Sequence, residues 1–121
     1  MFLVTTNKPR RLLHLSFIGH VSVEELQQGG NDMAALLADM PAGLRVLGDL
    51  ERLQSMSEGC VEQIGKNMEL LDRHGVELVV RVVPDPSKDI GFNILMVFHY
   101  RNRPRVITCE TIAEASRLLR L

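Results

Sequence analysis

Several features that would narrow the function of this chain are scarce or missing. It has no tryptophan, two cysteines, and 14 lysines and arginines against 15 aspartates and glutamates, for a formal net charge of -1. Without a basic excess, binding to a phosphate backbone is a poor hypothesis, because such binding relies on clustered lysine and arginine. Cys60 and Cys109 lie far apart and form no CxxC pair, which argues against a disulfide scaffold or a zinc ribbon. We therefore expect two buried, reduced thiols and no nucleic-acid partner.

Long hydrophobic runs and ligand-binding motifs are missing as well. The apolar stretch that starts at Met1 is interrupted by Lys8, so it is too short for a signal peptide or a membrane span. No histidine or cysteine pair has metal-binding spacing, and neither GxGxxG nor GxxxxGK[ST] occurs. We expect a cytoplasmic protein with no membrane span, no metal and no cofactor.

The residues that are present predict one α/β domain spanning 1–121. Hydrophobic residues make up 45% of the chain and charged residues 24%, which is ordinary for a globular protein of 121 residues. Period-2 or β-branched runs predict strands at 2–6, 12–18, 44–50, 76–83 and 106–109. Helical patterns predict helices at 23–40, 61–74, 85–100 and from 112 to the end. The order β-β-α-β-α-β-α-β-α predicts a mixed, mostly parallel sheet of about five strands with about four helices.

Two of the expected helices begin with a capping-box pattern. Ser22 precedes Glu25 by three residues, and Thr111 has the same spacing to Glu114. In the second helix, the apolar positions at helical spacing predict a buried stripe formed by Val61, Ile64, Met68 and Leu71.

Four short segments resemble motifs of one known family. Ile18-Gly19-His20 is similar to its φ-G-x after the second strand, and Val46 to Leu50 is similar to its "vvlDl" strand, with Asp49 as the best-matched polar residue. Ser55-Met56-Ser57-Glu58-Gly59 stands where that family has a D-S-S-G loop, and the segment 108–115 is similar to its closing "s..eAl". The chain thus resembles the STAS domain, the fold of bacterial anti-sigma-factor antagonists and of sulfate-transporter cytoplasmic tails.

This resemblance implies a protein partner, either a kinase or an anti-sigma-factor-like protein. In antagonists of the family, a partner kinase phosphorylates the second serine of D-S-S-G and so switches off binding. Here, counting from Asp49 places Gly59 at that position, whereas alignment on the glycine places Glu58 there, with Ser57 beside it. Our leading hypothesis is therefore a non-enzymatic module that binds a protein partner through the loop from Gln54 to Gly59, together with Asp49 and the neighbouring third helix. Its serine switch is absent or moved to Ser57 or Ser55. The alternative is that either serine only caps the second helix.

The expected third helix is apolar nearly all round between Ile90 and Phe98. A helix that covers one sheet face needs a single apolar stripe, and the remaining apolar side chains need another cover. We expect a partner-binding or homodimer surface formed by Phe92, Leu95, Met96 and Phe98, with burial by the first helix as the alternative.

Two other classes of function remain open. In the second hypothesis, the chain senses or carries a small apolar or anionic ligand, which is held between the third helix and the sheet edge. The third hypothesis, an enzyme using Asp49, His20 or Cys60, ranks last because no GxSxG or similar catalytic motif occurs.

Overall fold

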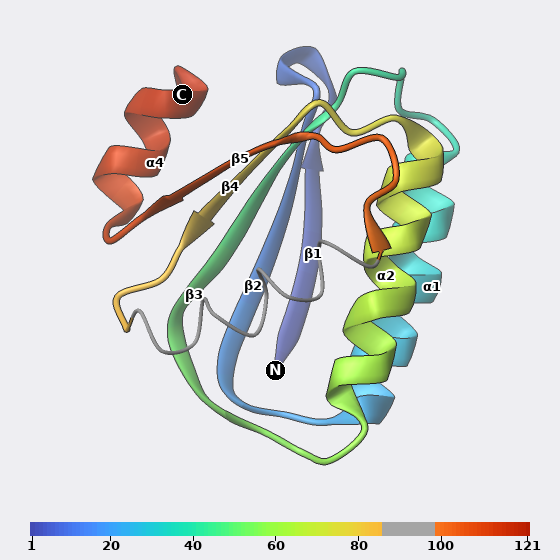
Figure 1. Cartoon of the computed structure of the whole chain (residues 1–121), viewed down its shortest axis with the longest axis vertical. Helices are drawn as coiled ribbons and strands as arrows, with labels where there is room; N and C mark the ends of the chain where they lie inside the picture. The colour runs from blue at the N-terminus through green and yellow to red at the C-terminus, as the bar shows by residue number, and fades with distance from the viewer. Residues whose placement is uncertain (86–98) are drawn as a thin grey trace.

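The computed structural model describes residues 1–85 and 99–121. One five-stranded sheet runs through it in the order β1-β2-β3-β4-β5 (Figure 1). The strands are β1 (Phe2–Asn7), β2 (Leu12–Val21), β3 (Arg45–Met56), β4 (Leu78–Val82) and β5 (Arg105–Cys109), and the described α-helices are α1 (Val23–Leu37), α2 (Cys60–His74) and α4 (Ile112–Leu119). The other expected helix, from Asp85 to about Tyr100, falls mostly outside the described residues. No helix of the described part is long and apolar enough to cross a membrane.

The sheet has the mixed arrangement that the element order predicts. β1 and β2 pair antiparallel, and a short 3-10 turn at Lys8–Arg10 joins them. β2, β3, β4 and β5 then pair parallel in sequence order. The mostly parallel α/β fold is therefore confirmed.

Helices cover the two faces of the sheet unequally (Figure 1). α1 and α2 pack together on one face over the larger hydrophobic core, and α4 packs against β4 and β5 on the other. Val79 on β4 and Val83 directly after it belong to the larger core, whereas Val80 and Val82 on β4 belong to the smaller one. This two-sided burial explains why β4 reads as a continuous β-branched run.

β2 and β3 extend further than the sequence pattern predicts. The pairing jumps from Ser16↔Asp49 to Ile18↔Arg52 and again from Gly19↔Leu53 to His20↔Ser55, so β3 carries two extra residues in two bulges. Bulges interrupt the period-2 alternation, which is why the pattern ends near Leu50 while the strand continues to Met56. The expected loop from Gln54 to Gly59 is thus wrong in its first part, because Gln54, Ser55 and Met56 belong to the strand.

The helix ends follow the sequence signals. The Ser22 hydroxyl accepts a hydrogen bond from the Glu25 amide at 3.2 Å, and Glu25 Oε1 accepts one from the Ser22 amide at 3.2 Å, which confirms the capping box of α1. The Thr111 hydroxyl caps α4 by accepting from the Glu114 amide at 3.2 Å. α2 ends at Gly75, whose φ of 85° lies in the left-handed region.

Candidate functional site

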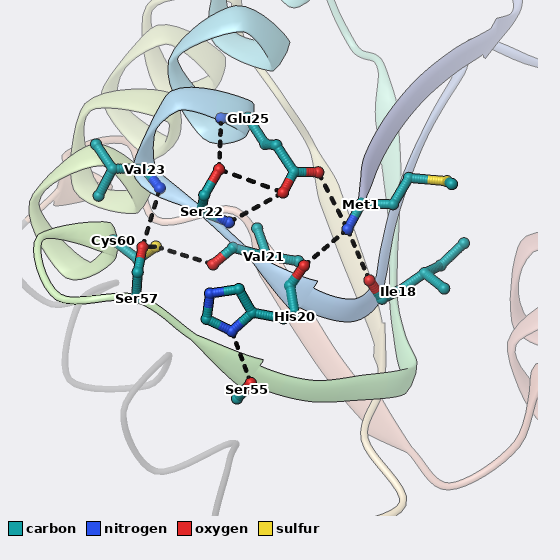
Figure 2. A network of polar contacts seen from close by, with 10 residues as sticks. All are labelled: Met1, Ile18, His20, Val21, Ser22, Val23, Glu25, Ser55, Ser57 and Cys60. Atoms are coloured by element: carbon teal, nitrogen blue, oxygen red, sulfur yellow. Dashed lines mark hydrogen bonds and ion pairs between the residues drawn. The ribbon is translucent and has the colours of Figure 1, made fainter.

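α1 and α2 begin side by side, where the parallel strands β2 and β3 end (Figure 2). The Ser57 amide donates to the Val21 carbonyl at 3.0 Å, and the Ser57 hydroxyl accepts from the Val23 amide at 3.2 Å. Val23 is the first residue of α1, and its amide has no partner within its own helix. A serine that precedes α2 therefore supports the start of α1. We call this region, where both helices begin, the α1/α2 junction.

Cys60 completes the inner side of the α1/α2 junction. It is 2% exposed, and its sulfur donates to the Val21 carbonyl at 3.5 Å and lies 3.6 Å from the Ser57 hydroxyl. These contacts give Cys60 a structural role in joining β2 to α2.

The N-terminal amine closes the outer side of the α1/α2 junction (Figure 2). The Met1 amine donates to the Ile18 carbonyl at 2.7 Å and the His20 carbonyl at 3.0 Å, and it pairs with Glu25 Oε2 at 3.0 Å. The pKa of the Glu25 carboxyl is lowered, mainly by its hydrogen bond to this amine and to a smaller extent by its hydrogen bond to the Ser22 amide. One carboxylate thus serves both the capping box and the ion pair.

The second serine of this region has a different environment. Ser55 is exposed, and its hydroxyl lies 2.8 Å from Nδ1 of His20, the residue paired with it across β2 and β3. Neither side chain is buried, so the Ser55 hydroxyl is open to another protein, whereas Ser57 is half-buried and already holds the Val23 amide.

No serine caps α2. Its N-cap is Gly59, with φ of 86° and no side-chain cap, and Glu58 precedes it as an exposed residue. The alternative in which Ser55 or Ser57 caps the second helix is therefore wrong, because Ser57 bonds to the start of α1 instead.

Val61 is the functional candidate that sequence reasoning missed. It was expected in the buried stripe of α2, but its side chain is 64% exposed. The buried stripe instead starts one residue earlier, at Cys60, and continues through Ile64, Met68 and Leu71. Both choices fit helical spacing, and only Gly59 as the N-cap could have indicated that Cys60 opens the helix. We call the surface formed by the exposed residues Ser55, Glu58, Gly59 and Val61, together with the half-buried Ser57, the docking face.

A groove between the two helices adjoins the docking face. It has a volume of about 230 Å³ and starts beside Gly59, where an added Cβ would lie 3.1 Å from the Val23 side chain. An ion pair at 3.6 Å between Glu62 and Lys66 lies along its α2 side. The groove is lined by Val23, Gln27, Gly59, Glu62, Gln63 and Lys66.

Asp49 does not join the docking face. It lies six residues before Ser55 on β3, roughly 15–20 Å away along a strand. Its carboxylate accepts a hydrogen bond from the Glu51 amide at 3.0 Å, at the first bulge. Asp49 therefore stabilises the irregular pairing of β3.

The three residues of the enzyme hypothesis have separate partners. Asp49 bonds to the Glu51 amide, His20 to Ser55, and Cys60 to the Val21 carbonyl. The two cysteines also belong to different cores on opposite sides of the sheet. The pKa of the Cys109 thiol is raised, mainly by burial and to a smaller extent by the nearby Glu114 charge. This thiol therefore stays protonated at neutral pH.

Two other predictions concern the surface of the third helix and the binding of a metal ion. The surface of Phe92, Leu95, Met96 and Phe98 lies outside the described residues and stays a prediction. Within residues 1–85 and 99–121, no three histidine, cysteine, aspartate or glutamate side chains gather as a metal site would require.

A cavity lies on the face of the sheet that α1 and α2 cover. Its volume is about 60 Å³, enough for a small group of atoms, and its walls are almost entirely apolar. Polar residues also line it, namely the buried Asn67, Arg81 and Tyr100. Burial raises the pKa of the Tyr100 hydroxyl well above its usual range, and the Arg81 charge opposes this. The apolar walls include Phe2, Leu15, Phe17, Leu26, Val46, Leu50, Ile64 and Met68.

Comparison with known proteins gives structural neighbours. No protein-family model and no curated protein sequence matches the chain. The anti-sigma factor antagonist SpoIIAA in its unphosphorylated form has a TM-score of 0.69 at 16% identity, over 99% of this chain and 98% of that chain. A DUF3478-family protein with a SpoIIAA-like fold from Shewanella loihica has a TM-score of 0.72 at 14% identity, over 98% of this chain and 92% of that one. An anti-sigma factor antagonist from Mycobacterium paratuberculosis has a TM-score of 0.59 at 16% identity, over 100% and 94% of the two chains. At these identities the likeness establishes the fold, and the chain therefore has a SpoIIAA-like, STAS-like fold.

Proposed function

We propose that this chain is a non-enzymatic regulatory module that binds a protein partner through the docking face. The observation that carries the proposal is the exposed Val61 beside the exposed Glu58 and Gly59. A partner that covers this apolar side chain gains binding free energy, because the contact removes apolar surface from water. Neighbours named as anti-sigma factor antagonists share the fold along nearly the whole chain, which supports a regulatory role.

The partner that fits best is an anti-sigma-factor-like protein or kinase in a bacterial cytoplasm. The resemblance of the sequence to the STAS domain motivates this choice, and the two buried, free cysteines are compatible with a reducing compartment. We infer that binding does not depend on a phosphoserine at the start of α2, because Glu58 and Gly59 stand at that position.

If the chain is switched by phosphate, we infer that Ser55 is the better acceptor of the two displaced serines. Its hydroxyl is exposed and faces His20, whereas the Ser57 hydroxyl is half-buried against the Val23 amide. A kinase can reach Ser55 without opening the first turn of α1.

Capture with matched variants tests the docking face. The purified chain, Val61→Glu and Leu118→Glu are immobilised in parallel, and proteins retained from the native cell are quantified by mass spectrometry. Leu118 is the control because it is also an exposed apolar residue, at 42%, but lies on α4. We expect a kinase or anti-sigma-factor-like protein on the wild type and on Leu118→Glu, and its loss on Val61→Glu. Equal retention by all three, or no such protein, would contradict the proposal.

Phosphate mapping tests the switch separately. Trypsin cleaves after Arg52 and Lys66, so one peptide carries both Ser55 and Ser57, and fragment ions that break on either side of Met56 assign the phosphate. We expect any phosphate on Ser55, absent from Ser55→Ala and retained in Ser57→Thr. Phosphate on Ser57 alone would reverse the assignment without affecting partner binding.

A second function, the sensing or carriage of a small ligand, is favoured by the cavity beneath α1 and α2. Its apolar walls suit a short hydrocarbon, and the buried Arg81 at its lining suits an anionic head group. We infer that such a ligand enters between the sheet and the two helices.

Propionate and propanol, which are short enough for a cavity of about 60 Å³, separate the two ligand chemistries. Binding is followed through the methyl signals of Leu15 and Val46, which line the cavity. Preference for propionate supports an anionic ligand, equal binding supports an apolar one, and no binding of either eliminates this function. Gly48→Val, which fills the cavity from β3, is the matched control and should abolish either signal.

A further inference from the structure

The outer edge of β1 presents a regular row of backbone groups. Met1 and Ile18 exchange both backbone hydrogen bonds, at 2.7 and 2.8 Å, so they form a hydrogen-bonded pair of the antiparallel ladder. In such a ladder the bonded pairs alternate, so every second residue from Met1 bonds to β2. The amides and carbonyls of Phe2, Val4 and Thr6 must therefore face away from β2.

The β1 edge lacks the features that usually keep an edge strand from pairing with another chain, such as charged residues, proline and bulges. In the described part of the chain, β1 pairs only with β2, and no backbone bond joins the outward groups to another element. The six residues of β1 include no charge, proline or glycine, and their register with β2 has no bulge. β5, at the opposite edge, begins with Arg105 directly after Pro104. Regular, uncharged edges such as β1 favour pairing with another strand.

We propose that β1 is the contact edge of a homodimer, in which the β1 strands of two copies pair antiparallel about a twofold axis at Val4. In this register Val4 faces Val4 of the second copy, and Phe2 faces Thr6. The outward groups lie on alternate residues centred on Val4, so these pairs can exchange both backbone bonds. The edge is thus self-complementary, as a twofold interface requires. The proposal is independent of the docking face.

Side-chain exposure on β1 supports a second copy as the occupant. Five large hydrophobic side chains are exposed in the described part, and two of them, Met1 at 53% and Leu3 at 46%, lie at this edge. In the proposed register, Leu3 lies directly opposite Thr5 of the second copy. Cross-strand pairing would then cover part of Leu3 on the sheet face that α4 leaves open.

Two double variants test the register. Leu3→Lys with Thr5→Lys places lysine opposite lysine across the twofold axis, whereas Leu3→Lys with Thr5→Glu places lysine opposite glutamate. Both residues are exposed in the single chain, so each variant should fold. By sedimentation equilibrium up to about 1 mM protein, we expect the wild type to dimerise. The first variant should dimerise about tenfold more weakly than the second, because each interface contains two such pairs.

A third variant tests the backbone bonds. Val4→Pro removes an outward amide without removing a bond to β2, so the chain should stay folded by circular dichroism and become monomeric. A strictly monomeric wild type would overturn the proposal. Equal dimerisation of the two lysine variants would also overturn it, since a dimer through any other surface does not set Leu3 against Thr5.

Discussion

Replacement of Ser57 by alanine should destabilise the fold far more than replacement of Ser55, although the two serines lie two residues apart. The Ser57 hydroxyl is the acceptor for the Val23 amide at 3.2 Å, in a half-buried position. Without it, that amide loses its partner at the start of α1, where the helix itself supplies none. Loss of an N-terminal support of this kind costs about 1–2 kcal/mol of unfolding free energy. Ser55→Ala removes only an exposed contact with His20 and should change stability by less than about 0.5 kcal/mol.

Urea unfolding followed by circular dichroism measures both changes, and hydrogen exchange of the Val23 amide locates the effect. Ser57→Thr is the matched control, because threonine keeps a hydroxyl and should restore most of the stability lost in Ser57→Ala. If Ser57→Ala and Ser55→Ala are equally mild, and the Val23 amide keeps its protection, then Ser57 does not support α1. The argument that favours Ser55 as the modifiable serine would fall with it.

Further predictions concern glycine packing, pH and the thiols. Gly48→Ala should stabilise the chain by about 0.5–1 kcal/mol in thermal unfolding, because the new Cβ meets its nearest neighbours at 3.6 Å or more beside the cavity. Gly29→Ala should destabilise it by about 1–2 kcal/mol despite better helix propensity, because its Cβ would overlap the Phe2 ring. Glu25→Gln should destabilise the chain at neutral pH, and the difference should disappear in acid: the folded pKa of Glu25 is lowered, so its contribution is present above the usual value of 4.5 and is lost as the pH falls through the folded pKa. Neither Cys60 nor Cys109 should react with a thiol reagent in the native chain, and both should react in urea, because both are buried.

The sequence predicts those parts of the fold that depend on local patterns. The capping box of Ser22 and Glu25 can be predicted from the sequence because both partners lie in one helical turn. β4 can be predicted as well, because a strand that is buried on both faces has a continuous run of β-branched residues. The sequence does not predict that Val61 is exposed, because two sets of apolar residues fit the buried stripe of the same helix. One set starts at Cys60 and the other at Val61, and only the position of the first helical turn decides between them.

The docking face depends on long-range pairing, which a single sequence does not record. Ser16 pairs with Asp49, so β3 without bulges would place Leu53 opposite His20. The two extra residues in β3 place Ser55 there instead and bring Ser57 to the start of α1. An error of one bulge would turn every following side chain to the other face of the sheet. The register between β2 and β3 therefore determines which serine is exposed and which one supports α1. The larger loss of stability in Ser57→Ala than in Ser55→Ala tests that register.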